Sequence, residues 1–331
     1  MKTCNRNLCA ALAAVWIVCG MLAVPVSGPA LAQEWPTRNV TVVVPLGAGS
    51  ATDIASRIVM DQLSRQTGQA FVIENRTGAG GTIGAGMVAK SAPDGYTVLS
   101  YGALSISNAL HSKLSYDAVN DFIPVIPFGH QPLLVVTSPD KGYKTLGDLI
   151  AAAKAKPGAM NFASAGVGSA SHFGAERLRV SAGFDAQHIP TKGAVEAATE
   201  ILSGRVDFSV STSSTTLPLI HEGKLVALAV SALKRSAVVP NVPTTVETGL
   251  RADSVYPFYS ALYLPAKTPR DIVEKLHREV AKALQTPAVQ ERFAKLGIEP
   301  MPMDVEQFGK FFRDDVASNV ALVKAAKLPT Q

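Results

Sequence analysis

Short apolar runs alternate with longer amphipathic segments from Val40 to the end of the chain. The runs are rich in β-branched residues and have the length of strands, whereas the segments between them have the length and period of helices. This alternation predicts an α/β fold with mostly parallel sheets flanked by helices, because parallel strands are joined by crossover helices. The predicted strands are Val40–Val44, Phe71–Ile73, Thr97–Tyr101, Leu133–Thr137, Met160–Ala163, Val206–Val210 and Leu225–Val230.

Capping patterns mark where several helices begin. Ser50–Asp53 and Thr145–Asp148 each place a hydroxyl residue three positions before an acid, which is a capping-box pattern. The run Thr268–Asp271 offers a cap, a proline at the first helical position and an acid in the first turn. A last helix is predicted from Val305 to Ala326.

Two proline-dense stretches predict how the chain divides. Phe122–Ser138 is apolar, contains three prolines and has no helical pattern, so we interpret it as a crossing into a second domain. Ser236–Gly249 follows a strand and precedes helices, and we interpret it as part of the return. The predicted domains are residues 33–132 together with 231–331, and residues 133–230.

The first 32 residues are typical of a secretory signal peptide. Lys2 and Arg6 precede an apolar run from Leu8 to Val24, and Ala30–Ala32 is a small-residue cleavage site. A transmembrane anchor is the weaker alternative, because the run stops at Pro25 and the cleavage site follows directly. The sequence therefore predicts cleavage near Ala32 and a periplasmic protein.

Composition narrows the possible functions. All three cysteines, Cys4, Cys9 and Cys19, lie in the predicted signal peptide, which excludes disulfides, cysteine-bound metals and thiol nucleophiles from the mature chain. The formal charge of +5 comes from dispersed basic residues without a Lys/Arg run, which argues against nucleic acid as a partner. A mature chain of about 300 residues fits two domains.

Three loops rich in glycine and serine are the candidate binding sites. Pro45–Asp53, Thr77–Thr82 and Ser164–His172 each follow a predicted strand and precede a predicted helix. Bare backbone N–H groups at a helix N-terminus form a site for an anion. The alternative is that the glycines only permit tight turns. Asp53 could likewise contact the ligand or have a structural part as the third residue of a capping box, and we favour the structural interpretation.

Nucleotide-binding and enzyme motifs are incomplete. In a dinucleotide fingerprint the third glycine would fall at Ile83 or Thr52, and there is no Walker A sequence. Ser231–Lys234 is a lone match to a β-lactamase element, and the six histidines are scattered without metal-ligand spacing. His172, near a helix start, is more typical of a surface or capping histidine than of a catalyst. Binding is therefore favoured over catalysis, and we expect no cofactor, metal or catalytic residue.

Short motifs run in a fixed order along the whole mature chain. They lie at Trp35–Arg38, Pro45–Asp53, Glu74–Gly81, Pro93–Thr97, Leu114–Asp117, Leu202–Asp207, Gly223–Leu225, Val242–Thr244 and Leu264–Pro269. Together they resemble the substrate-binding proteins of tripartite tricarboxylate transporters, also called Bug receptors. The resemblance implies a two-domain periplasmic binding protein fold of type II, the Venus flytrap, with a small carboxylate as ligand.

The resemblance also implies which residues bind the ligand. Those expected in the first domain are Leu46, Gly47, Ala48, Gly49, Ser50, Asp53, Gly78, Ala79 and Gly80. Those expected in the second domain are Ser164, Ala165, Ser169, His172, Thr191 and Asp207. Three positions depart from the family's pattern, since Ser50 replaces a glycine, Thr77 a proline and Thr191 a tyrosine. The added hydroxyl groups of Ser50 and Thr191 favour a more polar distal group on the ligand.

These features predict a periplasmic receptor that closes around a small organic carboxylate. We expect a monomer that docks on membrane transporter subunits. Two alternatives stay open: a receptor that reports its ligand to a signalling partner without transport, and, less favoured, an exported hydrolase. The main observation behind the prediction is three glycine- and serine-rich loops with few charged side chains.

Overall fold

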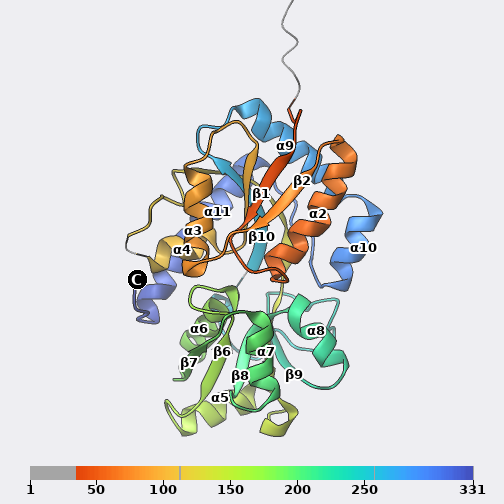
Figure 1. Cartoon of the computed structure of the whole chain (residues 1–331). Helices are drawn as coiled ribbons and strands as arrows, with labels where there is room; N and C mark the ends of the chain where they lie inside the picture. Colours follow the sequence, from red (N-terminus) through yellow and green to blue (C-terminus); the bar gives the residue numbers. More distant parts are fainter. Residues whose placement is uncertain (1–34, 112, 257, 331) are drawn as a thin grey trace, which may run out of the picture. The chain divides into compact units, whose positions relative to one another are not determined.

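The computed structural model describes residues 35–111, 113–256 and 258–330, so the predicted signal peptide lies outside the described residues. Within them, the strands form two five-stranded sheets with helices packed around each (Figure 1). We call the first sheet with α2–α4 and α9–α11 the first lobe, and the second sheet with α5–α8 the second lobe.

The first sheet has the strand order β2-β1-β3-β10-β4. Its strands are β1 (Val40–Val44), β2 (Phe71–Asn75), β3 (Thr97–Tyr101), β4 (Phe122–Gln131) and β10 (Phe258–Pro265). β1 pairs parallel with β2 and β3, whereas β10 pairs antiparallel with β3 and β4.

The second sheet has the order β7-β6-β8-β5-β9. Its strands are β5 (Leu133–Thr137), β6 (Asn161–Ser164), β7 (Gln187–Pro190), β8 (Phe208–Thr212) and β9 (Val226–Ser231). β6 pairs parallel with β7 and β8, whereas β5 pairs antiparallel with β8 and β9.

Helices connect these strands in the alternating order that the sequence predicts. They are α2 (Ala51–Thr67), α3 (Thr82–Ala89), α4 (Leu104–Leu110), α5 (Leu146–Ala155), α6 (Ala170–Ala182), α7 (Ala194–Leu202), α8 (Ser213–His221), α9 (Arg270–Leu284), α10 (Pro287–Lys295) and α11 (Val305–Ala325). None of the helices in the described part of the chain combines the length and apolar character needed to cross a membrane.

The α/β prediction is confirmed, but the sheets are mixed rather than mostly parallel. In each sheet one strand, β10 or β5, runs against both of its neighbours. The reason is the path of the chain between the sheets. β4 and β9 end at the carboxyl edges of their sheets, and the next strand enters the other sheet across its carboxyl edge. Such a strand must run antiparallel to the strands that end there.

The prediction lacks three strands, β4, β7 and β10, and β4 shows why. Pro124 and Pro127 argue against a strand, because proline cannot donate to the ladder. β4 is nevertheless the edge strand of its sheet, where one side needs no donors. Its register with β10 also shifts twice, between Ser260 and Ala261 and between Leu262 and Tyr263. Bulges at an edge therefore accommodate both prolines.

The capping predictions have mixed outcomes. Thr145 and Asp148 form the full capping box of α5. Ser50 caps α2, but the Asp53 carboxylate accepts from Gly49 N instead of Ser50 N. The Thr268 cap is wrong, because Pro269 is the N-cap of α9 and the Thr268 hydroxyl donates to Pro265 O.

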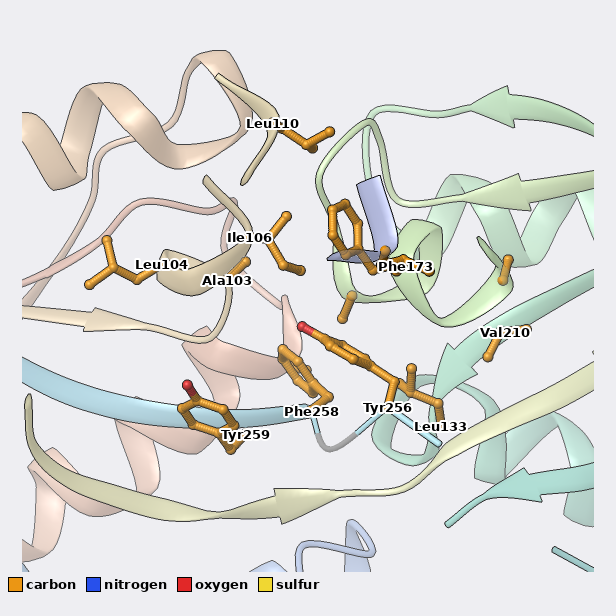
Figure 2. Close-up of a cluster of buried hydrophobic side chains, with 14 of the residues drawn as sticks. Ala103, Leu104, Ile106, Leu110, Leu133, Phe173, Val210, Tyr256, Phe258 and Tyr259 are labelled. Carbon is orange, nitrogen blue, oxygen red and sulfur yellow. The ribbon is translucent and has the colours of Figure 1, made fainter. Parts of the chain in front are cut away.

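The largest buried cluster contains side chains of both lobes. Figure 2 shows Leu104 and Ile106 of α4 on one side, Leu133 and Phe173 of the second lobe on the other, and Tyr256 between them. Tyr256 precedes β10, so the returning chain itself fills the junction. The two sheets therefore share one apolar core, while the predicted domain boundaries remain a prediction.

Candidate functional site

Helix N-termini gather at the carboxyl edges of both sheets. In the first lobe β1, β2 and β3 end at one edge and lead through short loops into α2, α3 and α4. In the second lobe β6, β7 and β8 do the same for α6, α7 and α8. An open α/β sheet offers its ligand site at such an edge, because the first N–H groups of each helix lack intrahelical acceptors.

Asp53 and Asn75 shape the first loop. The Asp53 carboxylate accepts hydrogen bonds from Gly49 N at 2.9 Å and from Arg57 Nε at 3.0 Å. Asn75 Nδ2 donates to Asp53 Oδ1 and to Leu46 O, each at 2.9 Å. Asp53 is only 2% exposed and already holds three partners. Its place in the structure supports the structural interpretation over direct ligand contact.

The pKa of Asp53 reflects these contacts. Burial alone would raise the pKa of its carboxyl, but the hydrogen bonds from Arg57, Gly49 and Asn75 outweigh burial and hold the pKa below its ordinary value. The carboxylate is therefore charged when it braces the loop. The predicted ligand residues Gly47 and Ala48 lie at the exposed tip of this loop, whereas Leu46 and Ser50 are half-buried.

The second loop consists of four consecutive residues with positive φ. Gly78, Ala79, Gly80 and Gly81 have φ values of 133°, 44°, 64° and 100°. A Cβ at Gly81 would overlap the Tyr101 hydroxyl, which donates to Gly80 O. Successive backbone N–H groups in a turn can form a concave anion site, often called a nest. In this turn Gly81 N already donates to Gly78 O at 2.9 Å. The glycines here are required by geometry.

The loop of the second lobe is held by its own side chains. Ser164 Oγ accepts from Gly166 N at 3.1 Å, and Ser171 Oγ accepts from Ala165 N at 2.9 Å. Ser169 caps α6 by accepting from His172 N at 3.2 Å. The predicted hydroxyl groups of Ser164 and Ser169 therefore bond to the loop backbone. Because His172 N is taken by the cap, the first two N–H groups of α6, on Ala170 and Ser171, are the ones left to meet a ligand.

His172 belongs to a stack of three rings. Its ring lies 4.0 Å from that of His188, which in turn lies 4.9 Å from Phe162. His172 Nδ1 accepts from Gly168 N at 3.3 Å, and His188 Nε2 is 2.6 Å from Ser164 Oγ. His172 is buried rather than at the surface, and it supports the loop through Gly168.

Burial keeps both histidines neutral. Desolvation, together with His188 and Arg179, lowers the pKa of His172 to about 3, and desolvation lowers the pKa of His188 to about 4. A neutral imidazole can accept from Gly168 N, whereas an imidazolium cannot. Both rings thus have a structural part in the loop that contains Ser164 and Ser169.

Thr191 is committed to the loop backbone. Its N and Oγ1 donate to Ser164 O at 3.0 and 2.9 Å, and Oγ1 also lies 2.8 Å from Gly193 O. The Ser50 hydroxyl likewise accepts from Asp53 N at 3.3 Å. We expected both hydroxyl groups to favour a polar distal group on the ligand. The Thr191 hydroxyl hydrogen is already donated to a backbone carbonyl, so this hydroxyl is not available as a donor to the ligand.

Asp207 does not lie with the other predicted ligand residues. It precedes β8 and sits beside Asn161, whose N donates to Asp207 Oδ2 at 2.9 Å. Lys141 Nζ is 2.8 Å from Asp207 Oδ1. Ser164 marks the opposite end of the neighbouring strand β6. Asp207 is therefore at the amino edge of the sheet, in a structural ion pair.

Loops of the two lobes approach each other. A Cβ at Gly80 would lie 3.5 Å from Val167 O of the second lobe. A Cβ at Gly168 would lie 3.1 Å from Leu110 Cδ1 of α4. The structure thus brings the Thr77–Thr82 loop of the first lobe together with the Ser164–His172 loop of the second lobe, at the edge where the helix N-termini gather.

A further turn at this edge was not predicted from the sequence. Thr212 caps α8 at the end of β8, and Ser214 Oγ donates to Gln131 Oε1 at 3.0 Å. Gln131 is buried at the end of β4. In the sequence, this turn is marked by a run rich in hydroxyl side chains, Ser209 to Thr216, which directly follows the apolar start of the strand.

Within the described residues no cluster of histidine, cysteine or acidic side chains could hold a metal ion.

Comparison with known proteins identifies the family. Residues 55–328 match the model of the tripartite tricarboxylate transporter family receptor. Protein BugT of Bordetella pertussis is 34% identical over 323 residues, which cover 97% of this chain and 98% of BugT.

Solved structures that are similar to this chain include three that cover most of its length. Periplasmic binding protein BugD is 30% identical with a TM-score of 0.82, covering 90% of this chain and 100% of BugD. MatC from Rhodopseudomonas palustris with bound malate is 32% identical with a TM-score of 0.81, covering 87% and 100%. R. palustris Rpa4515 with adipate is 29% identical with a TM-score of 0.83, covering 89% and 99%.

These matches confirm the fold and the class of protein. The chain has the two-domain α/β fold of periplasmic binding proteins, the Venus flytrap, and its relatives are solute-binding receptors and not enzymes. The chain belongs to the tripartite tricarboxylate transporter receptor family.

Proposed function

We propose that this receptor captures a small organic carboxylate between the loops of its two lobes. The observation that carries the proposal is the run of positive φ from Gly78 to Gly81, in a loop that Val167 of the second lobe approaches at the edge where the helix N-termini gather. The malate bound to MatC and the adipate bound to Rpa4515 support a carboxylate as the ligand class.

Backbone donors suit this ligand for a physical reason. A helix N-terminus carries roughly half a positive charge, and N–H groups bond more strongly to a carboxylate than to a neutral oxygen. The hydroxyl groups of Ser50, Ser164 and Ser169 are already bonded within their own loops. Loops held in shape before binding lose little conformational freedom when the ligand arrives.

Domain closure is the proposed means of capture. Opening and closing would use the two connections between the sheets, at Pro132 and in the segment from Ala232 to Tyr256, as the hinge. Closure would exclude water from the bonds to the carboxylate and so strengthen them. Ligand identity would then be set by the loops that meet, which include Val167 and Gly168.

The cellular setting is part of the same proposal. We infer export to the periplasm by the predicted signal peptide, with cleavage near Ala32, and action as a monomer that passes its ligand to membrane transporter subunits. The transporter partner is suggested by the family of receptors to which the chain belongs.

Isothermal titration calorimetry of the mature chain from Gln33 tests the proposal. The ligand panel should contain malate, adipate, citrate, an aromatic acid and an acidic amino acid, with a neutral amide analogue of each hit as control. Calorimetry is preferable to tryptophan fluorescence, because Trp35 is the only tryptophan after residue 34 and packs against Phe71 and Tyr96.

We expect at least one carboxylate to bind with 1:1 stoichiometry and its amide analogue to bind at least tenfold more weakly. Small-angle scattering with and without that ligand should report a smaller radius of gyration when it is bound. Failure of every carboxylate, or equal binding of the amide, would contradict the proposed ligand class. An unchanged radius of gyration would contradict closure alone.

A further inference from the structure

The first lobe contains a cavity of about 710 Å³ that is separate from the proposed carboxylate site. β4 forms its floor, α9 and α10 form two walls, and the segment from Ile298 to Gln307 forms a third. None of the ligand residues predicted from the sequence lines it. The cavity therefore needs an explanation of its own.

The inside of the cavity is apolar and already formed. Its floor and walls include Phe128 and Phe293, which are 2% and 6% exposed, together with Leu284, Met301 and Met303. Binding sites for small molecules are typically clefts of about 300–1,000 Å³ lined mainly by apolar side chains. The two methionines are half-buried and flexible, so they can adapt to the shape of an occupant.

Amide side chains stand at the rim. Gln285 and Gln290 are exposed and are joined by a long hydrogen bond of 3.4 Å, which leaves most of their polar groups available. Gln307 instead completes the capping box of α11, accepting from Asp304 N at 3.0 Å. Besides this mutual bond, the two amides at the rim can bond to one polar group of an occupant.

Charge is nearly absent from the lining. Among the described residues that line the cavity there is no lysine or arginine, and Asp304 is the one carboxylate. Asp304 accepts from Gln307 N at 2.8 Å as the N-cap of α11, and His277 Nε2 lies 2.9 Å from Met303 O. A charged ligand would lose its hydration here without gaining a partner of opposite charge, which is costly.

We propose that this cavity binds an uncharged, mostly apolar small molecule whose single polar group bonds to the side-chain amides of Gln285 and Gln290. The occupant is a small molecule and not a protein, because 17 residues line the cavity, fewer than the roughly 20–30 residues on each side of a stable protein interface. This ligand is chemically opposite to the carboxylate proposed for the loops, so the two sites do not compete.

A neutral fluorescent probe tests the proposal on the mature chain. N-phenyl-1-naphthylamine is uncharged at neutral pH and brightens in apolar surroundings. Ala294→Phe and Ala281→Phe fill the cavity from α10 and α9 respectively. Ala288→Phe is the matched control, because Ala288 is exposed on α10 but does not line the cavity.

We expect saturable 1:1 binding of the probe to the wild type and to Ala288→Phe. Ala294→Phe and Ala281→Phe should bind the probe at least tenfold more weakly, while melting temperature and carboxylate calorimetry stay close to wild type. Having two filling variants on different helices protects the test against one that folds poorly.

Three results would overturn the proposal. They are probe binding that does not saturate, equal binding by Ala294→Phe and Ala288→Phe, and a wild-type dimer in sedimentation that excludes the probe, which would mean that a second copy covers the cavity. Loss of carboxylate binding in calorimetry with intact probe binding would instead count against the proposed function alone.

Discussion

At the scale of single residues, most polar side chains at the candidate site form hydrogen bonds to the backbone of their own loops, so they are not free to bond to a ligand. Asp53, Ser164, Ser169 and Thr191 all bond to their own loops. Several N–H groups of the loops are bonded to these same side chains, so the donors that remain are the other backbone N–H groups, such as those of Gly47 and Ala48 at the exposed tip of the first loop. Binding by backbone explains how a site can take an anion with few charged side chains near it, and why a search for catalytic or basic residues finds little.

The stacked histidines make a pH-dependent contribution to stability. A histidine titrates near pH 6.5 in an unfolded chain, whereas burial lowers the pKa of His188 to about 4 and that of His172 to about 3 in the folded chain. The unfolded chain therefore binds more protons between these limits. The contribution is complete above pH 6.5 and is lost progressively as the pH falls from 6.5, a loss that ends near pH 4 for His188 and near pH 3 for His172.

His188→Gln should reduce this acid sensitivity. Glutamine does not titrate, so the free energy of unfolding should fall less steeply than in wild type between pH 6.5 and pH 4. We expect a difference of about 1–3 kcal/mol, allowing for the partial exposure of His188. Urea unfolding at pH 7, 5.5 and 4.5 measures it. His221→Gln is the control, since His221 is exposed. Equal slopes in His188→Gln and wild type would refute the assignment.

At the scale of elements, the strand–loop–helix units were predictable because local signals agree there. The β1 and β3 strands have the predicted bounds, and α11 differs from prediction by one residue. The loops at Gly47–Ser50 and Gly78–Gly81 could also be recognised, since glycines between a strand and a helix are a local signal. The alternation of apolar strands with helices was therefore enough to predict which loops form the candidate site.

The missed elements depend on distant partners. β10 and β4 pair with each other across more than a hundred residues, and prolines in β4 obscure its pattern. The place of Asp207 at the amino edge could not be predicted, because a motif shows that a residue recurs in a family, but not at which edge of a sheet it lies. The β8–α8 turn was missed because hydroxyl residues without glycine do not stand out as an anion loop.

Gly81→Ala tests the second loop as an element. Gly81 has a φ of 100°, and a Cβ there would overlap the Tyr101 hydroxyl. Strain of this kind costs about 1–3 kcal/mol, so the melting temperature and the affinity for the carboxylate should both fall. Gly147→Ala in α5 is the control, because Gly147 is not among the predicted ligand residues and its added Cβ would meet only Thr145 Oγ1, at an ordinary contact distance of 3.5 Å. Differential scanning calorimetry and titration measure both effects, and equal behaviour of the two variants would contradict the argument.

At the scale of the whole molecule, α6 of the second lobe is bonded to α11 of the first. Arg177 is 7% exposed, and its guanidinium donates to Ser318 Oγ at 3.0 Å and to Asn319 Oδ1 at 3.1 Å. Asn319 Nδ2 donates in turn to Ser105 Oγ, and Ser105 donates to the buried carboxylate of Asp315. This polar network lies beside the apolar cluster that both lobes share.

A shared core and this network predict that the two lobes unfold together. Urea unfolding should show one transition by circular dichroism and by the fluorescence of Trp35, which lies in the first lobe. Arg177→Met removes both bonds to α11 and leaves the buried Asn319 Oδ1 without its donor, so it should lower the free energy of unfolding by about 1–3 kcal/mol and move the whole transition. Arg313→Met, an exposed change on α11, should move it little. If Arg177→Met instead separates the two signals into distinct transitions, the lobes are independent folding units, and the bonds between α6 and α11 are what couples them in the wild type.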